Sequence, residues 1–153
     1  MSKNINIIEN SIQTIINNNE RMSWDEYFIS IALLVSCRSP SNKLKVGCAI
    51  IKDNRIISCG YNGYPSNTPH ISIERDTHEQ NTIHAEQNAI SDAARRGVCI
   101  DKSAIYITHY PCINCAKYII SSGIKKVYYR HDYRNDELVA QLLGLSNIEV
   151  MKI

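Results

Sequence analysis

Apolar positions recur along the chain at two spacings, and these spacings predict alternating helices and strands. Behind Ser23 an apolar stripe runs at helical spacing until Arg38, and Glu26, three positions after Ser23, completes a capping box. Short apolar runs predict strands over residues 46–51, 55–60, 104–108, 125–129 and 148–152. Three further amphipathic segments predict helices over residues 85–96, 112–122 and 135–143.

The order of these elements predicts the fold class. Strands that alternate with helices are typical of an α/β protein, in which helices cover the faces of a sheet. The first two strands follow each other through residues 52–54 and are expected to form a hairpin. Gly97 and Gly123 come just after two predicted helices and are expected to end them. A polar, proline-bearing loop is expected over residues 61–82.

The first twenty residues differ in composition from the rest of the chain. Isoleucine and asparagine dominate residues 1–20, and the isoleucines at positions 5, 8, 12, 15 and 16 follow a helical spacing. Asparagine is a poor helix former, however, and no firm cap is present. We therefore expect residues 1–20 to form a weakly ordered tail or a short docking helix, and residues 21–153 to form the domain.

Composition limits the classes of function. With 153 residues, 44% of them hydrophobic and 21% charged, the chain suits one domain with a core. The net charge of +2, from 17 basic and 15 acidic side chains, gives no basic footprint for a nucleic acid partner. No apolar run approaches the roughly 20 residues of a membrane helix, so no membrane partner is expected. The first residues lack the features of a signal peptide, and we expect a cytoplasmic protein.

Six cysteines, at positions 37, 48, 59, 99, 112 and 115, raise the question of their use. Their irregular spacing and the missing export signal argue against a disulfide frame. Cys112 and Cys115 form the one Cys-x-x-Cys pair, a pattern shared by metal sites, redox pairs and structural zinc knuckles. The other four cysteines are expected to be ordinary residues, because buried free cysteine is common.

Two short segments carry the candidate chemistry, namely His84-Ala85-Glu86 and Pro111-Cys112-Ile113-Asn114-Cys115. Each begins a predicted helix directly after a loop or a strand. Cysteines three positions apart on a first helical turn can both reach one ion, and the positive end of the helix dipole favours their thiolates. His84 can supply a nitrogen as the third ligand.

The type and number of these ligands indicate a metal and its role. Two thiolates and an imidazole in tetrahedral geometry favour zinc. A structural zinc has four protein ligands, whereas a catalytic zinc keeps one position for water. Three ligands beside a carboxylate therefore predict a catalytic Zn²⁺, with Glu86 as a proton shuttle rather than a ligand. His-x-Glu followed by Pro-Cys-x-x-Cys is the signature of zinc-dependent deaminases.

Beyond these two segments, the chain resembles the cytidine deaminase superfamily and, within it, the deoxycytidylate (dCMP) deaminases. The resemblance runs from about Ser23 to the C-terminus, and its strongest segments are residues 24–28, 36–39, 45–47, 60–65, 84–90 and 111–120. It implies a three-layer α/β/α fold with a central mixed sheet of about five strands, and a dCMP-type deaminase domain over residues 21–153.

The resemblance also implies a reaction, the zinc-dependent hydrolysis of dCMP to dUMP and ammonia, which supplies dUMP for thymidylate synthesis. His84, Cys112 and Cys115 would hold the zinc, and Glu86 would carry protons. The resemblance further implies substrate contacts, with the Ala85 backbone at the base and Asn62 at the sugar. For the phosphate it implies Arg38 with Ser39 first, and Tyr133 with Arg134 second, because a guanidinium suits phosphate oxygens.

Many members of the family are hexamers activated by dCTP and inhibited by dTTP with Mg²⁺. The resemblance therefore implies a homo-oligomer with an allosteric site at Asn62, Gly63 and Tyr64. Asn67 stands where the family often has glycine, and asparagine is the next best residue for a left-handed turn. His70 and His78 could bind a second metal, but this loop lacks the cysteines some members use, which favours polar loop histidines.

Three alternatives remain open from the sequence. The enzyme could act on dCTP, or on both dCMP and dCTP, because this choice depends on the room around the phosphate. A zinc deaminase acting on a nucleic-acid base is disfavoured by the net charge of +2 and by residues 115–120. A zinc-stabilised nucleotide sensor is disfavoured by Glu86, since a sensor has little use for that carboxylate beside a three-ligand metal.

Overall fold

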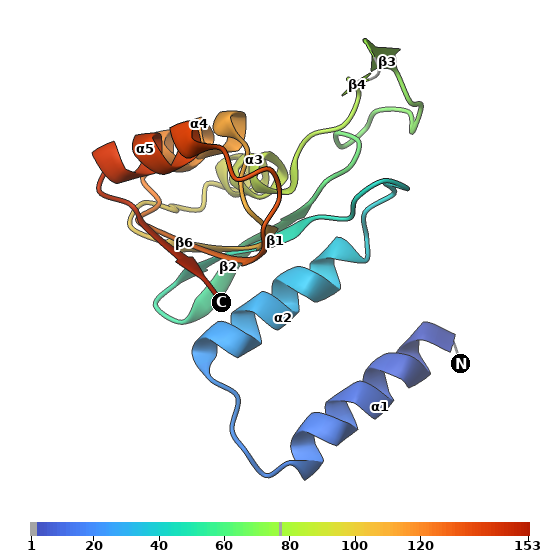
Figure 1. Ribbon diagram of the computed structural model, residues 1–153. Coiled ribbons are helices and arrows are strands. Elements are labelled where there is room, and N and C mark those ends of the chain that lie inside the picture. The colour runs from blue at the N-terminus through green and yellow to red at the C-terminus, as the bar shows by residue number, and fades with distance from the viewer. Residues whose placement is uncertain (1–2, 77) are drawn as a thin grey trace.

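A mixed five-stranded sheet forms the centre of the computed structural model, which describes residues 3–76 and 78–153 (Figure 1). The strands are β1 (Gly47–Lys52), β2 (Arg55–Tyr61), β5 (Ala104–His109), β6 (Lys126–His131) and β7 (Glu149–Lys152). Their order is β2-β1-β5-β6-β7, with β5, β6 and β7 parallel and β1 antiparallel to both neighbours. The predicted central mixed sheet is confirmed.

Helices cover both faces of this sheet (Figure 1). The helices are α1 (Lys3–Asn17), α2 (Trp24–Ser36), α3 (Ala85–Arg96), α4 (Ile113–Ser121) and α5 (Glu137–Leu145). Figure 1 shows α2 on one face and α3, α4 and α5 on the other. The expectation of three α/β/α layers is therefore correct.

Local signals in the sequence fix several element boundaries. The Ser23 hydroxyl accepts from the Glu26 N–H at 3.2 Å, and the Glu26 carboxylate accepts from the Ser23 N–H at 2.7 Å, which confirms the capping box. The β1–β2 hairpin turns at Asp53 and Asn54, both with positive φ. Gly97 ends α3 in the left-handed conformation, and Asn67 adopts it as predicted.

Two buried clusters lie on the two sides of the sheet. The larger one, beneath α3, α4 and α5, is mostly aliphatic and alanine-rich. The smaller one, beneath α2, contains three aromatic side chains, and its Phe28 is only 1% exposed, a burial that stabilises the fold by about 1.5–3 kcal/mol. There the Tyr106 and Tyr128 rings stack with centroids 4.4 Å apart, and the Tyr106 hydroxyl donates to Asp25 at 2.6 Å.

The helices approach the sheet closely at two glycines. A Cβ added at Gly60 on β2 would lie 2.2 Å from the carbonyl oxygen of Ala85, in the first turn of α3. A Cβ added at Gly47 on β1 would lie 2.2 Å from the carbonyl oxygen of Ala32 on α2. Because the atoms in the way are backbone, a larger residue at Gly60 can fit only if α3 moves away from the sheet.

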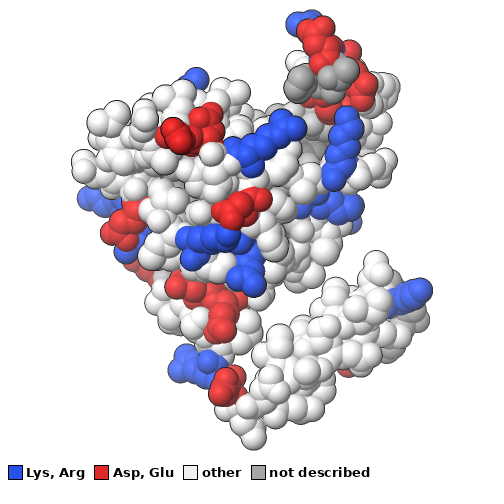
Figure 2. Space-filling view, viewed as in Figure 1, with Lys and Arg blue, Asp and Glu red and all other residues white. Residues whose placement is uncertain are grey.

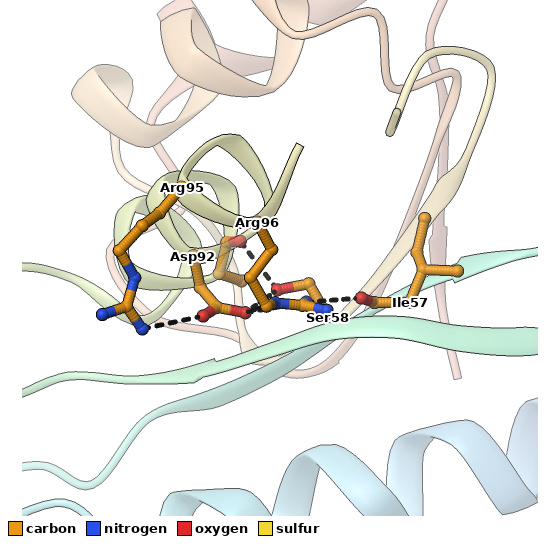
Figure 3. A network of polar contacts seen from close by, with 6 residues as sticks. Ile57, Ser58, Asp92, Arg95 and Arg96 are labelled. Carbon is orange, nitrogen blue, oxygen red and sulfur yellow. Dashed lines mark hydrogen bonds and ion pairs between the residues drawn. The ribbon is translucent and has the colours of Figure 1, made fainter. Parts of the chain in front are cut away.

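The last turns of α3 are tied to β2 by polar contacts (Figure 3). The β1–β2 register shifts at Ile57, which has no paired residue on β1. The Ile57 carbonyl oxygen accepts a hydrogen bond from the Arg96 guanidinium at 2.7 Å. Arg96 also donates to Asp92 at 2.8 Å, and the buried Ser58 hydroxyl donates to the Ala89 carbonyl oxygen at 2.8 Å. Both ends of α3 are thus attached to one edge strand.

The loop that follows β2 contains structure that the sequence did not predict. Strands β3 (Glu74–Arg75) and β4 (His78–Glu79) form a small antiparallel pair within it. Two-residue strands show no hydrophobic periodicity, so no signal was available. The His70 ring stacks on Tyr64 with centroids 4.9 Å apart, whereas the His78 side chain lies outside the described part of the chain.

The N-terminal segment forms helix α1, of which no described side chain is buried. Figure 2 shows its surface nearly free of charge, whereas acidic and basic side chains alternate over the rest of the visible face. The division into a segment 1–20 and a domain 21–153 stays a prediction, and residues 1–2 lie outside the described range. Within the described residues, no helix has the length and apolar character needed to cross a membrane.

Replacing Gly60 with alanine tests the close approach of α3. We expect the free energy of unfolding to fall by about 3 kcal/mol or more, because the new methyl group meets backbone atoms. Gly144→Ala is the matched control, since nothing lies within 4 Å of a Cβ there and Gly144 is within α5. That change should raise stability by about 0.5–1 kcal/mol in urea unfolding. Equal stability of both variants would contradict the packing.

Candidate active site

The first turns of two helices meet at one end of the sheet and bring three metal-binding side chains together. His84 is the extended N-cap of α3, and its N–H donates to the Gln87 side chain at 3.1 Å. Cys112 is the extended N-cap of α4, and Cys115 lies in the first turn of that helix. The backbone of both caps is therefore set by the start of a helix, which fixes where each side chain begins.

The three side chains have the spacing of a zinc site. The Nδ1 atom of His84 lies 3.4 Å from the Sγ atom of Cys112 and 3.4 Å from the Sγ atom of Cys115. All three donor atoms lie within 4.8 Å of one another. A tetrahedral zinc with ordinary Zn–N and Zn–S bonds places its nitrogen and sulfur ligands about 3.5 Å apart. In the described part of the chain this is the one such group of three donors.

In the metal-free protein, one of the two cysteines is a thiolate and the other keeps its proton. Hydrogen bonds from Cys115 and His84 lower the pKa of Cys112 to about 3, despite partial burial. The neighbouring Cys112 thiolate and burial raise the pKa of Cys115, which therefore keeps its proton. A soft, anionic sulfur is thus already present at the site, and a cation that displaces the second proton gains two thiolate ligands.

The other two ionisable groups also have shifted pKa values. The hydrogen bond to Cys112 raises the pKa of His84, although burial opposes the shift. Burial raises the pKa of Glu86, which is only 4% exposed. A carboxylate with a raised pKa accepts a proton more readily than one in water, which is consistent with the predicted proton shuttle.

A cavity of about 400 Å³ opens onto these groups. Of the residues predicted to bind substrate, four line it, namely Asn62, Ala85, Tyr133 and Arg134, together with Glu86 and the metal donors His84 and Cys112. Arg38, Ser39, Gly63 and Tyr64 are not among the lining residues. The structure therefore brings the second pair of predicted phosphate contacts to the cavity and leaves the first pair outside it.

Asn62 links two loops at the rim of the cavity. Its side-chain oxygen accepts from the Val46 N–H at 2.8 Å, and its side-chain nitrogen donates to the Leu44 carbonyl oxygen at 2.9 Å. The Ser39 hydroxyl, which is buried, donates to the Asn62 carbonyl oxygen at 2.9 Å. The Asn62 amide has a second N–H that can donate to a ligand. Its contact with a sugar stays a prediction. Ser39 therefore contacts the cavity only indirectly, through its hydrogen bond to the Asn62 backbone.

Arg38 and Arg134 occupy different positions relative to the cavity. Arg38 is exposed just after α2. Arg134 lies beyond the end of β6, with its guanidinium 5.6 Å from the centroid of the Tyr133 ring. Its φ of 44° is positive, a conformation that costs a bulky residue free energy and is concentrated at functional sites. The strained backbone makes Arg134 the stronger candidate of the two.

Several lining residues were missed by the sequence interpretation, and they are Leu44, Val46, His109, Tyr110, Ile113 and Asp136. The apolar ones carried no chemical signal because they resemble ordinary core residues. His109 did carry a signal, since it lies three positions before Cys112 at the end of a predicted strand. The carboxyl ends of parallel strands are where ligands bind in α/β sheets, which could have identified it.

Comparison with known proteins connects this chain to a family. Residues 22–131 match the family described as the cytidine and deoxycytidylate deaminase zinc-binding region. ComE operon protein 2 of Bacillus subtilis is 41% identical over 138 residues, which cover 88% of this chain and 73% of that protein. The zinc-binding description agrees with the donor set of His84, Cys112 and Cys115, which fits Zn²⁺.

Two further relatives carry a more specific name. Deoxycytidylate deaminase of Saccharomyces cerevisiae is 34% identical over 140 residues, which cover 85% of this chain. The match covers 45% of the yeast protein, so this chain spans about half the length of that relative. The crystal structure of a dCMP deaminase from cyanophage S-TIM5 in complex with dCMP and dUMP is 34% identical, with a TM-score of 0.78. That match covers 87% of this chain and 100% of the cyanophage chain.

Zinc affinity should depend on pH in two stages. Zinc must displace the proton of Cys115 throughout the neutral range, and it must also displace the proton of His84 once the pH falls below that histidine's raised pKa. We expect affinity to fall about tenfold per pH unit above the raised pKa of His84 and about a hundredfold per unit below it. Competition with a chromophoric chelator measures this, and a slope that stays constant would contradict the protonation states.

Proposed function

The chain belongs to the cytidine and deoxycytidylate deaminase family, and from that premise we propose that it catalyses the zinc-dependent hydrolysis of dCMP to dUMP and ammonia. One observation carries the proposal: a buried carboxyl group, Glu86, accompanies a group of three metal donors in the described residues, and Glu86, His84 and Cys112 line one cavity. Structural zinc sites use four protein ligands and need no such carboxyl group. The product dUMP is a substrate for thymidylate synthesis.

The side chains divide the chemistry among them. When bound, zinc lowers the pKa of a coordinated water toward roughly 7 and so supplies a nucleophile at neutral pH. Glu86 would accept one proton of the attacking water and deliver it to N3 of the cytosine as the oxygen adds to C4. It would then take the second proton from the new C4 hydroxyl and pass it to the exocyclic amine, which leaves as ammonia when the C4–N bond breaks. The raised pKa of Glu86, caused mainly by burial, suits the first transfer, because the carboxylate is a stronger base than one in water.

The remaining lining residues hold the nucleotide. We assign the base to the backbone of Ala85 at the start of α3, and the sugar to Asn62. Tyr133 and Arg134 are the proposed phosphate contacts, supported by their place at the cavity and by the positive φ of Arg134. Arg38, with Ser39 beside it, stays a second prediction. The Michaelis constants of Arg134→Ala and Arg38→Ala for dCMP and for deoxycytidine decide between the two arginines.

Regulation and assembly are carried over from the family as proposals. The proposed effectors are dCTP as activator and dTTP with Mg²⁺ as inhibitor, at a site formed by Asn62, Gly63 and Tyr64 in a homo-oligomer, with a hexamer as the expected state. The Tyr64–His70 stack supplies an aromatic surface for such a nucleotide. Turnover with each effector and mass by light scattering test both parts. If dCTP and dTTP leave turnover unchanged, the allosteric proposal is wrong.

Location and domain extent complete the proposal. We place the protein in the cytoplasm, because a reducing compartment keeps Cys112 and Cys115 as free thiols available to zinc. Residues 21–153 form the proposed deaminase domain, supported by the family match over residues 22–131 and by the absence of buried side chains in α1. Deleting residues 1–20 should leave dCMP turnover unchanged, and its loss would show that the first segment belongs to the catalytic unit.

Glu86→Gln tests the mechanism. The variant should bind zinc as tightly as the native protein, because Glu86 is not a ligand, and should turn over dCMP at least a hundredfold more slowly. Zinc content by mass spectrometry and the loss of cytosine absorbance measure the two properties. The native protein is assayed in parallel with dCMP, dCTP, deoxycytidine and CMP.

Each outcome of that experiment has a distinct meaning. Preference for dCTP over dCMP would replace the proposed substrate while keeping the mechanism. Full activity of Glu86→Gln would overturn the assigned role of the carboxylate. Zinc binding without turnover of any cytosine nucleotide by the native protein would leave a nucleotide sensor as the function.

A further inference from the structure

His109 is a polar residue of the cavity that the proposed mechanism does not use. It ends β5 and is paired in register with His131, which ends the parallel strand β6. Ligands of α/β sheets bind beyond the carboxyl ends of such strands. His109 is half-buried and lines the cavity, whereas His131 is exposed and is not a lining residue.

The surroundings of His109 determine which ring nitrogen carries its proton. The Thr108 hydroxyl is 1% exposed, accepts from the Gly47 N–H at 3.2 Å, and lies 2.9 Å from the Nδ1 atom of His109. A buried hydroxyl needs an acceptor for its own hydrogen, and Nδ1 is the one available within the described residues. Nδ1 therefore accepts, and the proton of the neutral ring lies on Nε2.

The neutral form of this ring is also favoured electrostatically. Burial and the neighbouring His131 both lower the pKa of His109. The other charged or titratable side chains of the cavity are those of Glu86, His84, Cys112, Tyr110, Tyr133, Arg134 and Asp136. His109 thus presents a fixed Nε2–H donor at neutral pH, and within residues 3–76 and 78–153 that donor has no hydrogen-bond partner.

His109 is contiguous with the proposed phosphate contacts. Its ring meets Tyr133 edge to face, with centroids 6.2 Å apart and an interplanar angle of 84°. The Arg134 guanidinium lies against the same Tyr133 ring. Three donors, from an imidazole, a phenol and a guanidinium, therefore follow one another along one part of the cavity, whereas Leu44, Val46 and Ile113 supply apolar lining. An anionic group of the ligand is best accommodated beside the three donors.

We propose that His109 is a substrate-binding residue that donates from Nε2 to the 5′-phosphate of the nucleotide and thereby favours dCMP over deoxycytidine. Thr108 is the positioning residue, because its hydroxyl holds the imidazole in the required tautomer. The inference rests on the proposed function for the identity of the substrate. It adds to that function a specificity contact that the zinc motif does not contain.

Replacing His109 with leucine removes the donor and keeps an apolar side chain of moderate size. We expect kcat/KM for dCMP to fall about tenfold or more, mainly through KM, because a hydrogen bond to a charged group is lost. For deoxycytidine, kcat/KM should change less than about twofold. His109→Gln, which keeps an N–H donor, should recover most of the loss. His131→Leu is the matched control: it removes the exposed neighbouring ring, leaves Thr108 to hold the His109 imidazole, and should change kcat/KM for either substrate by less than about twofold.

A measurement on the unaltered protein covers the case in which His109→Leu folds poorly. In zinc-loaded protein with ¹⁵N-labelled histidine, dUMP should shift the Nε2–H resonance of His109, and deoxyuridine should not. Equal shifts with both ligands, or equal losses of kcat/KM for dCMP and deoxycytidine, would overturn the phosphate contact. Absence of dCMP turnover in the native protein would instead reject the proposed function. The binding measurement separates the two failures, because it tests the phosphate contact without requiring turnover.

Discussion

The close approach of α3 to the sheet is the constraint on which the rest of the structure depends. Gly60 on β2 has no side chain, and the backbone of Ala85 and Ala89 occupies the space where one would be. The thiol of Cys48 on β1 donates to the Ala85 carbonyl oxygen at 3.1 Å from the neighbouring strand. Ala85 lies between His84 and Glu86. The contacts of Gly60 and Cys48 with the Ala85 backbone therefore also fix how far His84 and Glu86 lie from the sheet.

The start of α4 supplies the two sulfur donors that the start of α3 lacks. Helix α4 follows β5 closely, so the end of a central strand places Cys112 and Cys115 against His84. Neither helix alone has enough ligands for a metal ion, and each approaches the site with its positive end. The buried Glu86 then lies at a site where a cation offsets part of its desolvation. The metal-donor group, the Cys112 thiolate beside Cys115 and the position of the proposed proton shuttle Glu86 are therefore consequences of one packing arrangement.

Much of this could be predicted from the sequence, for reasons that are local. Ser23 with Glu26, the Asp53-Asn54 turn and Gly97 act through their nearest neighbours, so their spacing in the chain is sufficient. The zinc donors were predictable because their chemistry restricts the residue types and their spacing.

The remaining features depend on contacts between distant segments. The amide of Asn62 is engaged by residues 44 and 46, which no pattern indicates. Whether Arg38 or Arg134 reaches the cavity depends on how the loops fold back, as does the tautomer that Thr108 imposes on His109.

The coordination of zinc in the native protein tests the central claim most directly. X-ray absorption at the zinc edge should show two sulfur ligands at about 2.3 Å and two nitrogen or oxygen ligands at about 2.0–2.1 Å, as expected for His84, Cys112, Cys115 and one exchangeable position. Addition of dUMP should alter the nitrogen and oxygen shell and leave the sulfur shell unchanged. Four sulfur ligands, or a spectrum indifferent to dUMP, would contradict a catalytic centre at the start of these two helices.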